Sequence, residues 1–314
     1  MAWAVHHIEA TGCTVTGPAS QPRVRPWSTQ LVLPTDEGTV WFKANQRYFA
    51  FEAALQVTIA ALVPGAVQAP LGADLSRGWM LTADHGPSMG DDGPPSPDAW
   101  TELVREAAAI QRALVGHRGR LLATGMPDCA PERAVAWFDE LRTTLRALPP
   151  EHPTRLGDDD ERLLDAAREV LGAACTTLAE SGLPATWNHG DLHPHNAYLA
   201  PDGGPDTTGT RLFDLGDSQW SHPLEILVVP HTCMREQGLG DEVAAATSAW
   251  AEVWGVEVDD ALLSAARVVQ AVNRSRTWWS WLDDTTPDEL ARYGPQTREH
   301  LLRVLAGPGP TDGL

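Results

Sequence analysis

Apolar and β-branched residues cluster in two short runs early in the chain and predict β-strands over residues 28–33 and 38–43. The segment between them, Pro-Thr-Asp-Glu-Gly, is made of turn-forming residues and predicts a hairpin. Apolar residues then recur every three or four positions over residues 46–63, which predicts a helix. Glu52 lies on the apolar stripe of that helix, where a carboxylate without a partner would be costly.

Two further β-type runs, over residues 67–71 and 79–83, complete a predicted five-stranded antiparallel sheet. The chain then breaks at Asp-His-Gly-Pro and continues through a stretch rich in glycine, proline and aspartate. We interpret residues 82–96 as a hinge. The predicted domains are an N-terminal lobe, 1–84, and a larger, mainly helical lobe, 85–314.

The remainder of the chain reads mainly as helix, so the predicted fold class is α+β. Serine followed by proline opens the first helix, and Thr-Pro-Asp-Glu forms a capping box before the last one. The predicted helices cover residues 96–115, 131–148, 158–180, 223–237, 241–254, 259–283 and 287–305. The predicted β elements are a strand over 185–188 and a hairpin of 197–200 with 211–213, around an exposed turn over 201–209. Residues 306–314 are expected to be a frayed tail.

The composition is that of a folded chain, because 43% of its 314 residues are hydrophobic. A formal net charge of −19 disfavours nucleic acid or an anionic membrane as a partner. It is compatible with a cationic substrate, and equally with solubility alone. Four scattered cysteines without a C-x-x-C pair favour a reduced, cytoplasmic protein. The N-terminus has no secretion signal pattern and no apolar run reaches about 18 residues, so we expect no membrane segment.

The polar segment 187–196 carries the first candidate chemistry. His189, Asp191 and Asn196 are spaced as H-x-D-x-x-x-x-N, the pattern of a kinase catalytic loop, and Asp214 follows the next β-type run. Transfer of a phosphoryl group to a hydroxyl needs a proton acceptor, a role that suits Asp191. It also needs Mg²⁺, which prefers oxygen ligands such as those of Asn196 and Asp214. We expect His189 to brace the loop by hydrogen bonds.

Lys43, at the end of a strand, and Glu52, on the following helix, fit the kinase arrangement in which a lysine pairs both with nucleotide phosphates and with a helix glutamate. Residues 17–27 occupy the place expected for a loop that covers the nucleotide. This segment lacks G-x-G-x-x-G, and its three prolines donate no backbone N–H. Other candidates for contacts with phosphate are Ser20, Ser28, Arg23 and Arg25.

Other interpretations stay open. His189, Asp191, His193 and His195 alternate, so on a strand they would face one way and could bind Zn²⁺ as in a hydrolase. Pro194 argues against a regular strand there. Each polar segment taken alone also fits an ordinary surface turn. A nucleotide-binding pseudokinase is a further hypothesis, disfavoured because every catalytic position is filled.

The ordered set of Lys43, Glu52, His-Gly-Asp-Leu-His-Pro-His-Asn and Phe-Asp-Leu-Gly-Asp resembles the aminoglycoside phosphotransferase and choline kinase-like family. The resemblance extends from about residue 40 to 225. It implies a bilobal, protein-kinase-like fold that binds ATP or GTP with Mg²⁺ and transfers the γ-phosphate to a hydroxyl of a small molecule. It also implies that Asp191 is the base, Asn196 and Asp214 are metal ligands, and Lys43 contacts the α- and β-phosphates. The nucleotide base is expected at the backbone of Thr82, Ala83 and Asp84.

The acceptor of that family lies against the helical lobe. The acceptor contacts implied in this chain are Asp217, Trp220, His222, Asn273, Trp278 and Trp281, although tryptophans on helices are more often core residues. We therefore predict an O-phosphotransferase that modifies an antibiotic. A metabolic kinase for a sugar, amino sugar or amino alcohol is the alternative, and either is expected as a monomer or homodimer.

Overall fold

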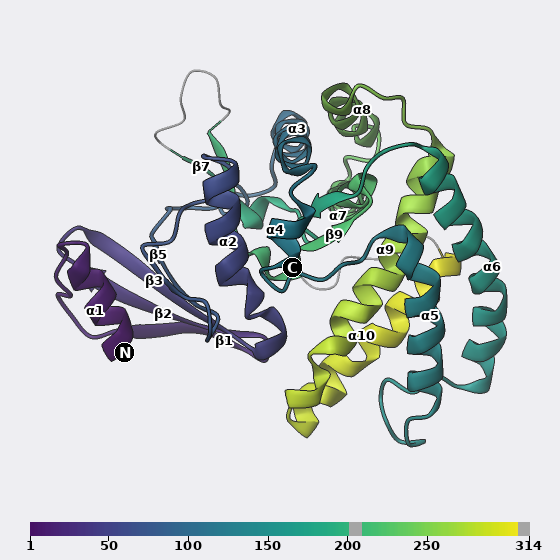
Figure 1. Ribbon diagram of the computed structural model, residues 1–314, viewed down its shortest axis with the longest axis horizontal. Helices are drawn as coiled ribbons and strands as arrows, with labels where there is room; N and C mark the ends of the chain where they lie inside the picture. Colours follow the sequence, from purple (N-terminus) through teal and green to yellow (C-terminus); the bar gives the residue numbers. More distant parts are fainter. Residues whose placement is uncertain (201–208, 307–314) are drawn as a thin grey trace. The chain divides into compact units, whose positions relative to one another are not determined.

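The predicted five-stranded antiparallel sheet is present in the computed structural model, which describes residues 1–200 and 209–306 (Figure 1). Its strands are β1 (Ser20–Arg25), β2 (Ser28–Thr35), β3 (Gly38–Asn45), β4 (Gly72–Asp74) and β5 (Trp79–Ala83). They are ordered β1-β2-β3-β5-β4, and every neighbouring pair is antiparallel. The predicted hairpin between β2 and β3 is confirmed, with Thr35 paired to Gly38.

Two segments of the sheet differ from the prediction. Residues 67–71 form no strand. Val67 makes only an isolated bridge to Leu212, and the fourth strand, β4, begins after this segment. Residues 17–27, predicted as a loop, contain β1, which a two-residue turn joins to β2. All but one residue of β1 are exposed, so the strand shows none of the apolar alternation that would have predicted it.

Helices lie on both faces of this sheet. On one face, α1 (Ala2–Ala10) buries Ala4 and Ile8 against an apolar cluster that includes Phe42 and Leu81. On the other face, α2 (Phe51–Leu62) follows the 3-10 turn η1 (Arg47–Phe49), and Figure 1 shows α1 and α2 on opposite sides of the strands. The helix α2 was predicted from its apolar period, whereas α1 was not predicted.

The chain divides into two compact units, which are described separately. The first, here called the sheet unit, comprises residues 1–93, 119–126 and 194–218. The second, the helical unit, comprises residues 94–118, 127–193 and 219–314. The predicted lobe boundary near residue 84 stays a prediction.

Besides the five strands, the sheet unit contains the predicted hairpin. It is formed by β7 (Ala197–Leu199) and β8 (Thr210–Leu212) and is confirmed by their antiparallel pairing. The 3-10 turns η2 (Pro194–Asn196) and η3 (Leu215–Asp217) flank it. Nearly all of the turn predicted over 201–209 lies outside the described residues.

The helical unit contains every long helix predicted after residue 95. Its helices are α3 (Pro97–Leu114), α5 (Pro131–Arg146), α6 (Asp158–Glu180), α7 (Val228–Glu236), α8 (Val243–Trp254), α9 (Asp260–Ser280) and α10 (Pro287–Ala306). Its shorter elements are η4 (Pro223–Leu227), η5 (Leu282–Asp284) and the paired strands β6 (Thr186–Asn188) and β9 (Gln219–Ser221). The short helix α4 (Arg118–Leu122) belongs to the sheet unit, apart from its first residue. The predicted tail lies outside the described residues, apart from the last residue of α10.

The helix caps read from the sequence form as expected. Ser96 accepts the backbone N–H of Ala99 at 3.2 Å and begins α3. At α10, Glu289 accepts the N–H of Thr286 at 2.8 Å, and the Thr286 hydroxyl accepts the N–H of Glu289 at 3.3 Å. These bonds satisfy backbone donors that the first turn of a helix leaves without partners.

A buried glutamine fixes β6, the strand that precedes the Asp191 loop. Gln111 of α3 donates to the carbonyl oxygens of Trp187 at 3.2 Å and Pro223 at 3.0 Å. Its own oxygen accepts the indole N–H of Trp250 at 3.0 Å. Because the amide is completely buried, losing one of these partners would leave a polar group unsatisfied. The core of the helical unit therefore positions the start of the motif.

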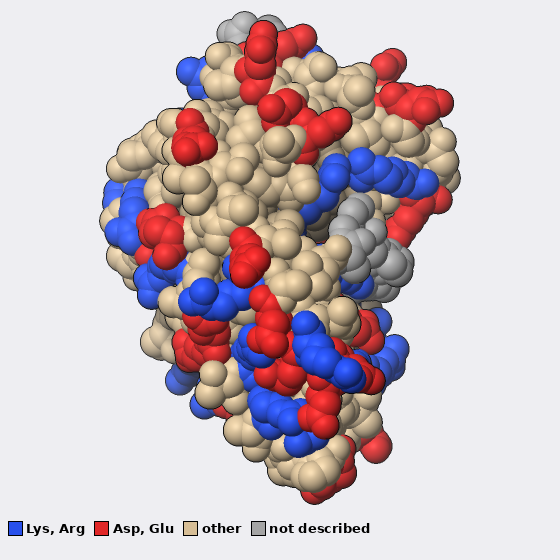
Figure 2. All heavy atoms as spheres, turned by 90° about the vertical axis from the view of Figure 1, so that its right-hand side faces the viewer, with Lys and Arg blue, Asp and Glu red and all other residues tan. Residues whose placement is uncertain are grey.

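Charges of both signs are mixed on the surface visible in Figure 2. Between α5 and α6, Arg168 pairs with Asp139 at 2.9 Å and Arg142 with Glu161 at 2.9 Å. On the side shown in Figure 2, the acidic residues are therefore not gathered into a single acidic patch. Among the described helices, none is both long and apolar enough to cross a membrane.

Candidate active site

Lys43, on β3 of the sheet unit, lies between two carboxylates. Its Nζ is 2.8 Å from Glu52 of α2 and 2.5 Å from Oδ1 of Asp214. The Lys43 side chain is 13% exposed and that of Glu52 is 1% exposed, so water screens this ion pair little. Burial alone would lower the pKa of Lys43, but Asp214 and Glu52 raise it above its usual range. The lysine therefore carries a fixed positive charge.

Glu52 accepts two further hydrogen bonds that hold it in place. Asn45 donates its side-chain N–H at 2.6 Å, and the backbone N–H of Leu215 donates at 3.1 Å. Burial raises the pKa of the Glu52 carboxyl, Lys43 lowers it, and Asp214 raises it again, with a net shift upward. Glu52 thus depends on Lys43 and these donors to remain ionised.

Asp214 and Asn196 meet at one end of the β7–β8 hairpin. The pairing of Ala197 with Leu212 puts Asn196 opposite Phe213, whose N–H donates to the Asn196 carbonyl oxygen at 3.0 Å. Asp214 is the next residue and has a left-handed backbone, with φ 58°, the only positive φ outside glycine in the described residues. That conformation costs roughly 1–2 kcal/mol for most residues, and Asp and Asn tolerate it best. Such strain is typical of functional sites.

The oxygen atoms of Asn196 and Asp214 fit Mg²⁺. The Asp214 side chain is 32% exposed, and Asn196 is the last residue of η2, directly before β7. Mg²⁺ commonly takes only one or two protein carboxylates and completes its octahedron with waters and phosphates. By contrast, no group of three or more His, Cys, Asp or Glu side chains that could hold a metal occurs in the described part of the chain. The donor set therefore fits a metal–nucleotide complex better than a protein-only cage.

The alternating strand on which the zinc hypothesis depended does not form. Residues Pro194–Asn196 form a 3-10 turn, so His193, which precedes the turn, and His195, which lies within it, are not aligned by a regular strand. The Nδ1 atom of His195 lies 3.5 Å from the Ser88 hydroxyl and 3.6 Å from a carboxylate oxygen of Asp91. Gly90 makes this approach possible, because a Cβ atom there would lie 2.6 Å from the imidazole ring. The zinc hypothesis loses its geometric basis.

Asp191 lies in the helical unit beside two basic side chains. Its carboxylate is 3.4 Å from Nε2 of His193 and 3.7 Å from the guanidinium of Arg274, which is 12% exposed. Burial alone would raise the pKa of Asp191, but the hydrogen bond from His193 and the charge of Arg274 hold it well below its ordinary value. The carboxylate is therefore ionised throughout the neutral range.

His189 is completely buried and supports the same loop. Its Nδ1 accepts the backbone N–H of Asp191 at 3.4 Å, and its ring packs edge-on against Trp187, with centroids 5.9 Å apart. Gly190, with φ 79°, makes the turn between them. The bracing expected of His189 therefore has a geometric basis.

The sequence matches no family model and no curated protein. Solved structures do match over nearly the whole chain. A macrolide 2′-phosphotransferase from Brachybacterium faecium is 14% identical, with a TM-score of 0.58, over 98% of this chain and 99% of its own. A choline kinase from Streptococcus pneumoniae is 12% identical, with a TM-score of 0.61, over 96% and 98%. APH(2″)-IIia in complex with GDP and kanamycin is 14% identical, with a TM-score of 0.61, over 96% and 98%.

The chain has the fold that these phosphotransferases and this choline kinase share. The resemblance inferred from the motifs is thereby confirmed at the level of the fold, together with the α+β class. Identities this low show the fold alone, and they assign no role to the individual residues of the motifs.

In this kinase fold the residues predicted to contact the nucleotide base lie at the end of β5. Thr82 and Ala83 close the strand, and the N–H of Asp84 donates to the carbonyl oxygen of Thr39 at 2.9 Å. The next residue, His85, was not predicted. Its ring stacks on Tyr198 with centroids 4.5 Å apart. Nothing in the local pattern indicated this contact, because Tyr198 belongs to a distant hairpin.

Ser28, the other residue predicted to bind nucleotide, opens β2. It is 4% exposed and pairs with Asn45 of β3 and Arg25 of β1. Its backbone therefore lies beside the strand that carries Lys43.

Three residues predicted to contact the acceptor are buried within the helical unit. Trp220 pairs with Trp187 across the β6–β9 ladder. Asn273 donates to the Glu225 carboxylate at 2.9 Å, and the backbone N–H of His222 donates to the same carboxylate at 3.1 Å. Burial raises the pKa of Glu225 to about 8 and lowers that of His222 to about 4. These contacts give Trp220, His222 and Asn273 structural roles, and their contact with an acceptor stays a prediction.

Trp278 and Trp281 pack with Tyr293 rather than forming an open aromatic surface. The Trp278 and Trp281 rings have centroids 5.6 Å apart, and Trp278 is stacked on Tyr293 at 6.3 Å. Arg274, whose role sequence reasoning missed, lies over Trp278 at 5.8 Å as well as beside Asp191. Asp217, the remaining acceptor candidate, is in η3 of the sheet unit.

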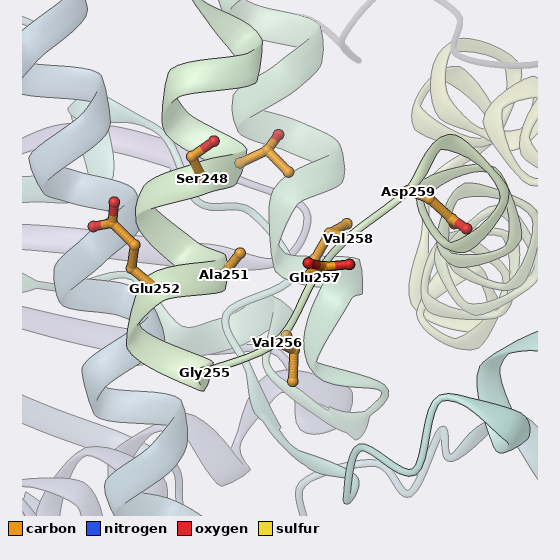
Figure 3. A pocket seen from close by; sticks show the side chains of 9 residues that line it. Ser248, Ala251, Glu252, Gly255, Val256, Glu257, Val258 and Asp259 are labelled. Atoms are coloured by element: carbon orange, nitrogen blue, oxygen red, sulfur yellow. The ribbon is translucent and has the colours of Figure 1, made fainter.

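A surface hollow of about 730 Å³ lies at the end of α8 and holds none of these residues (Figure 3). It is lined by Thr247, Ser248, Ala251, Glu252, Gly255, Val256, Glu257, Val258 and Asp259. Glu252 pairs with Arg105 at 2.9 Å, and Asp259 accepts the N–H of Leu262 at the start of α9. Two of its three carboxylates are thus engaged in structural contacts.

Proposed function

We propose that this protein is a Mg²⁺-dependent kinase that transfers the γ-phosphate of ATP or GTP to a hydroxyl of a small molecule. The observation that carries the proposal is the buried ion pair of Lys43 with Glu52 and Asp214, beside Asn196. A lysine held charged by two carboxylates offers a fixed positive charge to anionic phosphates. The kinase fold and the spacing of the Asp191 loop support the same reaction.

The sheet unit would hold the donor. Lys43 would contact the α- and β-phosphates, with Glu52 as the residue that positions it. Asn196 and Asp214 would hold Mg²⁺, which when bound neutralises negative charge on the phosphate oxygens. The backbone from Thr82 to Asp84 would bind the edge of the purine.

Asp191 would act on the acceptor hydroxyl. The hydroxyl oxygen forms a bond to the γ-phosphorus while the bond from that phosphorus to the bridging oxygen of the β-phosphate breaks. The hydroxyl proton passes to Asp191 and then to solvent, and the nucleoside diphosphate leaves. Because its pKa is held low, Asp191 is a weak base. Its main contribution is to orient the hydroxyl by accepting its hydrogen bond, and it takes the proton late.

The acceptor we propose is an antibiotic, as in resistance by phosphorylation. A macrolide phosphotransferase and a kanamycin complex among the similar folds favour this class. The similar choline kinase favours the alternative, a metabolic kinase for a sugar, amino sugar or amino alcohol. We propose that the protein acts in the cytoplasm as a monomer or homodimer, without nucleic acid or membrane partners.

The test is nucleotide consumption with Mg²⁺ across a panel of antibiotics, sugars and amino alcohols, with ATP and GTP measured separately. Asp191→Asn should reduce turnover by on the order of 10²-fold or more and leave nucleotide binding intact. Asp165→Asn is the matched control, because Asp165 is exposed and only pairs with Arg142 at 2.6 Å. Equal turnover in wild type and Asp191→Asn would remove Asp191 from the mechanism. Absence of nucleotide binding by the wild type would overturn the proposed function.

A further inference from the structure

The register of the sheet continues a row of polar side chains from Lys43 to the sheet edge. Arg23 of β1 is paired with Gln30 of β2, and Gln30 is paired with Lys43 of β3. Directly opposed residues in antiparallel strands project from the same face. Arg23 and Lys43 therefore share a face, two strand spacings of ~4.8 Å apart.

The neighbouring row repeats this arrangement. Arg25 is paired with Ser28, and Ser28 with Asn45. Asn45 donates to Glu52, so this row faces the same side as the Lys43 ion pair. The opposite face is apolar and packs against α1. The edge strand β1 therefore adds two arginines to the face that carries Lys43.

These two guanidinium groups lack acidic partners. Within the described residues, neither Arg23 nor Arg25 has a carboxylate oxygen within 4.0 Å. By contrast, Arg77, in the turn between β4 and β5, pairs with Asp74 at 3.4 Å. In a chain with 42 acidic and 23 basic residues, two adjacent arginines without a counter-charge form a local site of positive potential.

The turn between β1 and β2 cannot supply the backbone donors of a glycine-rich loop. It consists of Pro26 and Trp27 alone, since Arg25 already pairs with Ser28. Pro22, within β1, and Pro26 have no N–H to donate. Any contact that this hairpin makes with phosphate oxygens must therefore come mainly from side chains.

We propose that Arg23 and Arg25 bind the β- and γ-phosphates of the donor nucleotide and replace the glycine-rich loop. The inference rests on the proposed function. Lys43 shares its charge with two carboxylates, whereas the two arginines keep theirs available for a polyanion. Guanidinium groups bind phosphate oxygens through paired N–H donors, which suits the terminal phosphates. With these contacts, the protein would bind a nucleoside triphosphate more tightly than a nucleoside monophosphate.

The experiment measures the dissociation constants of Mg²⁺–ATP, Mg²⁺–GTP and AMP for the full chain. Arg23→Gln and Arg25→Gln should each weaken triphosphate binding by on the order of tenfold, the loss expected for one charge-assisted contact. AMP binding should change by less than about twofold, because AMP lacks the terminal phosphates. Arg23→Lys should restore part of the triphosphate affinity, since the charge returns without the planar fork.

Arg77→Gln is the matched control, because Arg77 belongs to the same sheet and its guanidinium lies over Trp79 at 4.7 Å. Triphosphate affinity that is unchanged in both arginine variants overturns the inference. A loss shared equally by AMP, or by Arg77→Gln, also overturns it, because the effect would then be structural or general to net charge. If Lys43→Ala weakens ATP binding and the arginine variants do not, this inference alone fails. If the wild type binds no nucleotide, the proposed function fails with it.

Discussion

Replacing Lys43 by methionine tests whether the ion pair is as deeply buried as the structure indicates. Methionine keeps most of the side-chain volume and removes the charge. Glu52, which is 1% exposed, would then face only neutral donors and the carboxylate of Asp214. The least costly response is for Glu52 to take up a proton, because burial already raises its pKa.

The magnitude follows from the ordinary pKa of a glutamate in the unfolded chain, about 4.3. Between that value and the raised folded pKa, the folded variant holds a proton that the unfolded chain has released. Its stability therefore falls as pH rises, by at most ~1.4 kcal/mol per pH unit. We expect Lys43→Met to lower the free energy of unfolding, and to lower it more at pH 7 than at pH 5, by up to ~1.4 kcal/mol for each pH unit over which the folded variant alone holds the proton.

Urea unfolding followed by circular dichroism at pH 5, 6 and 7 measures this difference. Adding Glu52→Gln to Lys43→Met removes the titrating group, so the double variant should lose the extra pH dependence. Arg168→Met is the control, because its ion pair with Asp139 is exposed and should contribute little at any of these pH values. The same loss of stability at pH 5 and pH 7 in Lys43→Met would refute the reasoning.

Two further predictions concern the helical unit. Burial raises the pKa of Glu225 to about 8, whereas a glutamate in the unfolded chain loses its proton at about pH 4.3. Between these two pH values only the folded wild type holds the proton, so its stability falls as the pH rises. Glu225→Gln should flatten that fall in urea unfolding at pH 5 to 8, and an unchanged slope would contradict the assignment. Arg274→Gln should raise the pKa of Asp191, so the acidic limb of kcat against pH should move to higher pH. Superimposable profiles would show that Arg274 does not act on Asp191.

Local signals predicted the long elements of the fold. The helix expected over residues 158–180 is found as α6 (Asp158–Glu180), because its apolar period is regular over six turns. The serine and threonine caps of α3 and α10 are short-range hydrogen bonds that three or four residues determine. The strand β9 has only three residues, and its position is set by pairing with β6, a strand distant in the chain. No window of sequence contains that information.

In the candidate site, too, local sequence signals predicted some residues, whereas contacts between distant segments were not predictable. Asp191, Asn196 and Asp214 were found from their spacing, and Lys43 with Glu52 from a strand and the helix that follows it. Lys43 and Asp214 are 171 positions apart, so their contact of 2.5 Å is set by the sheet and the hairpin. Residues that belong to no motif were missed, because only the folded chain brings them to the site.

Arg274 is an example, because it is one of several polar residues on a long helix. Only the packing of α9 brings it to Asp191. Arg23 and Arg25 were noted as possible contacts with phosphate in an irregular loop. The strand register gave them a defined face beside Lys43.

Three carboxylates of the candidate site differ because their surroundings differ. Asp191 has an arginine and a histidine beside it, so it remains ionised, as a group that accepts a hydrogen bond from a hydroxyl must. Glu52 is buried and shares one lysine with Asp214, so its ionisation depends on that lysine. Asp214 is partly exposed and has a left-handed backbone at the end of the hairpin, so its carboxylate is accessible to solvent and ions. The proposed roles of Asp191 as proton acceptor, Glu52 as positioning group and Asp214 as metal ligand agree with these differences in burial and neighbouring charge, although all three are carboxylates.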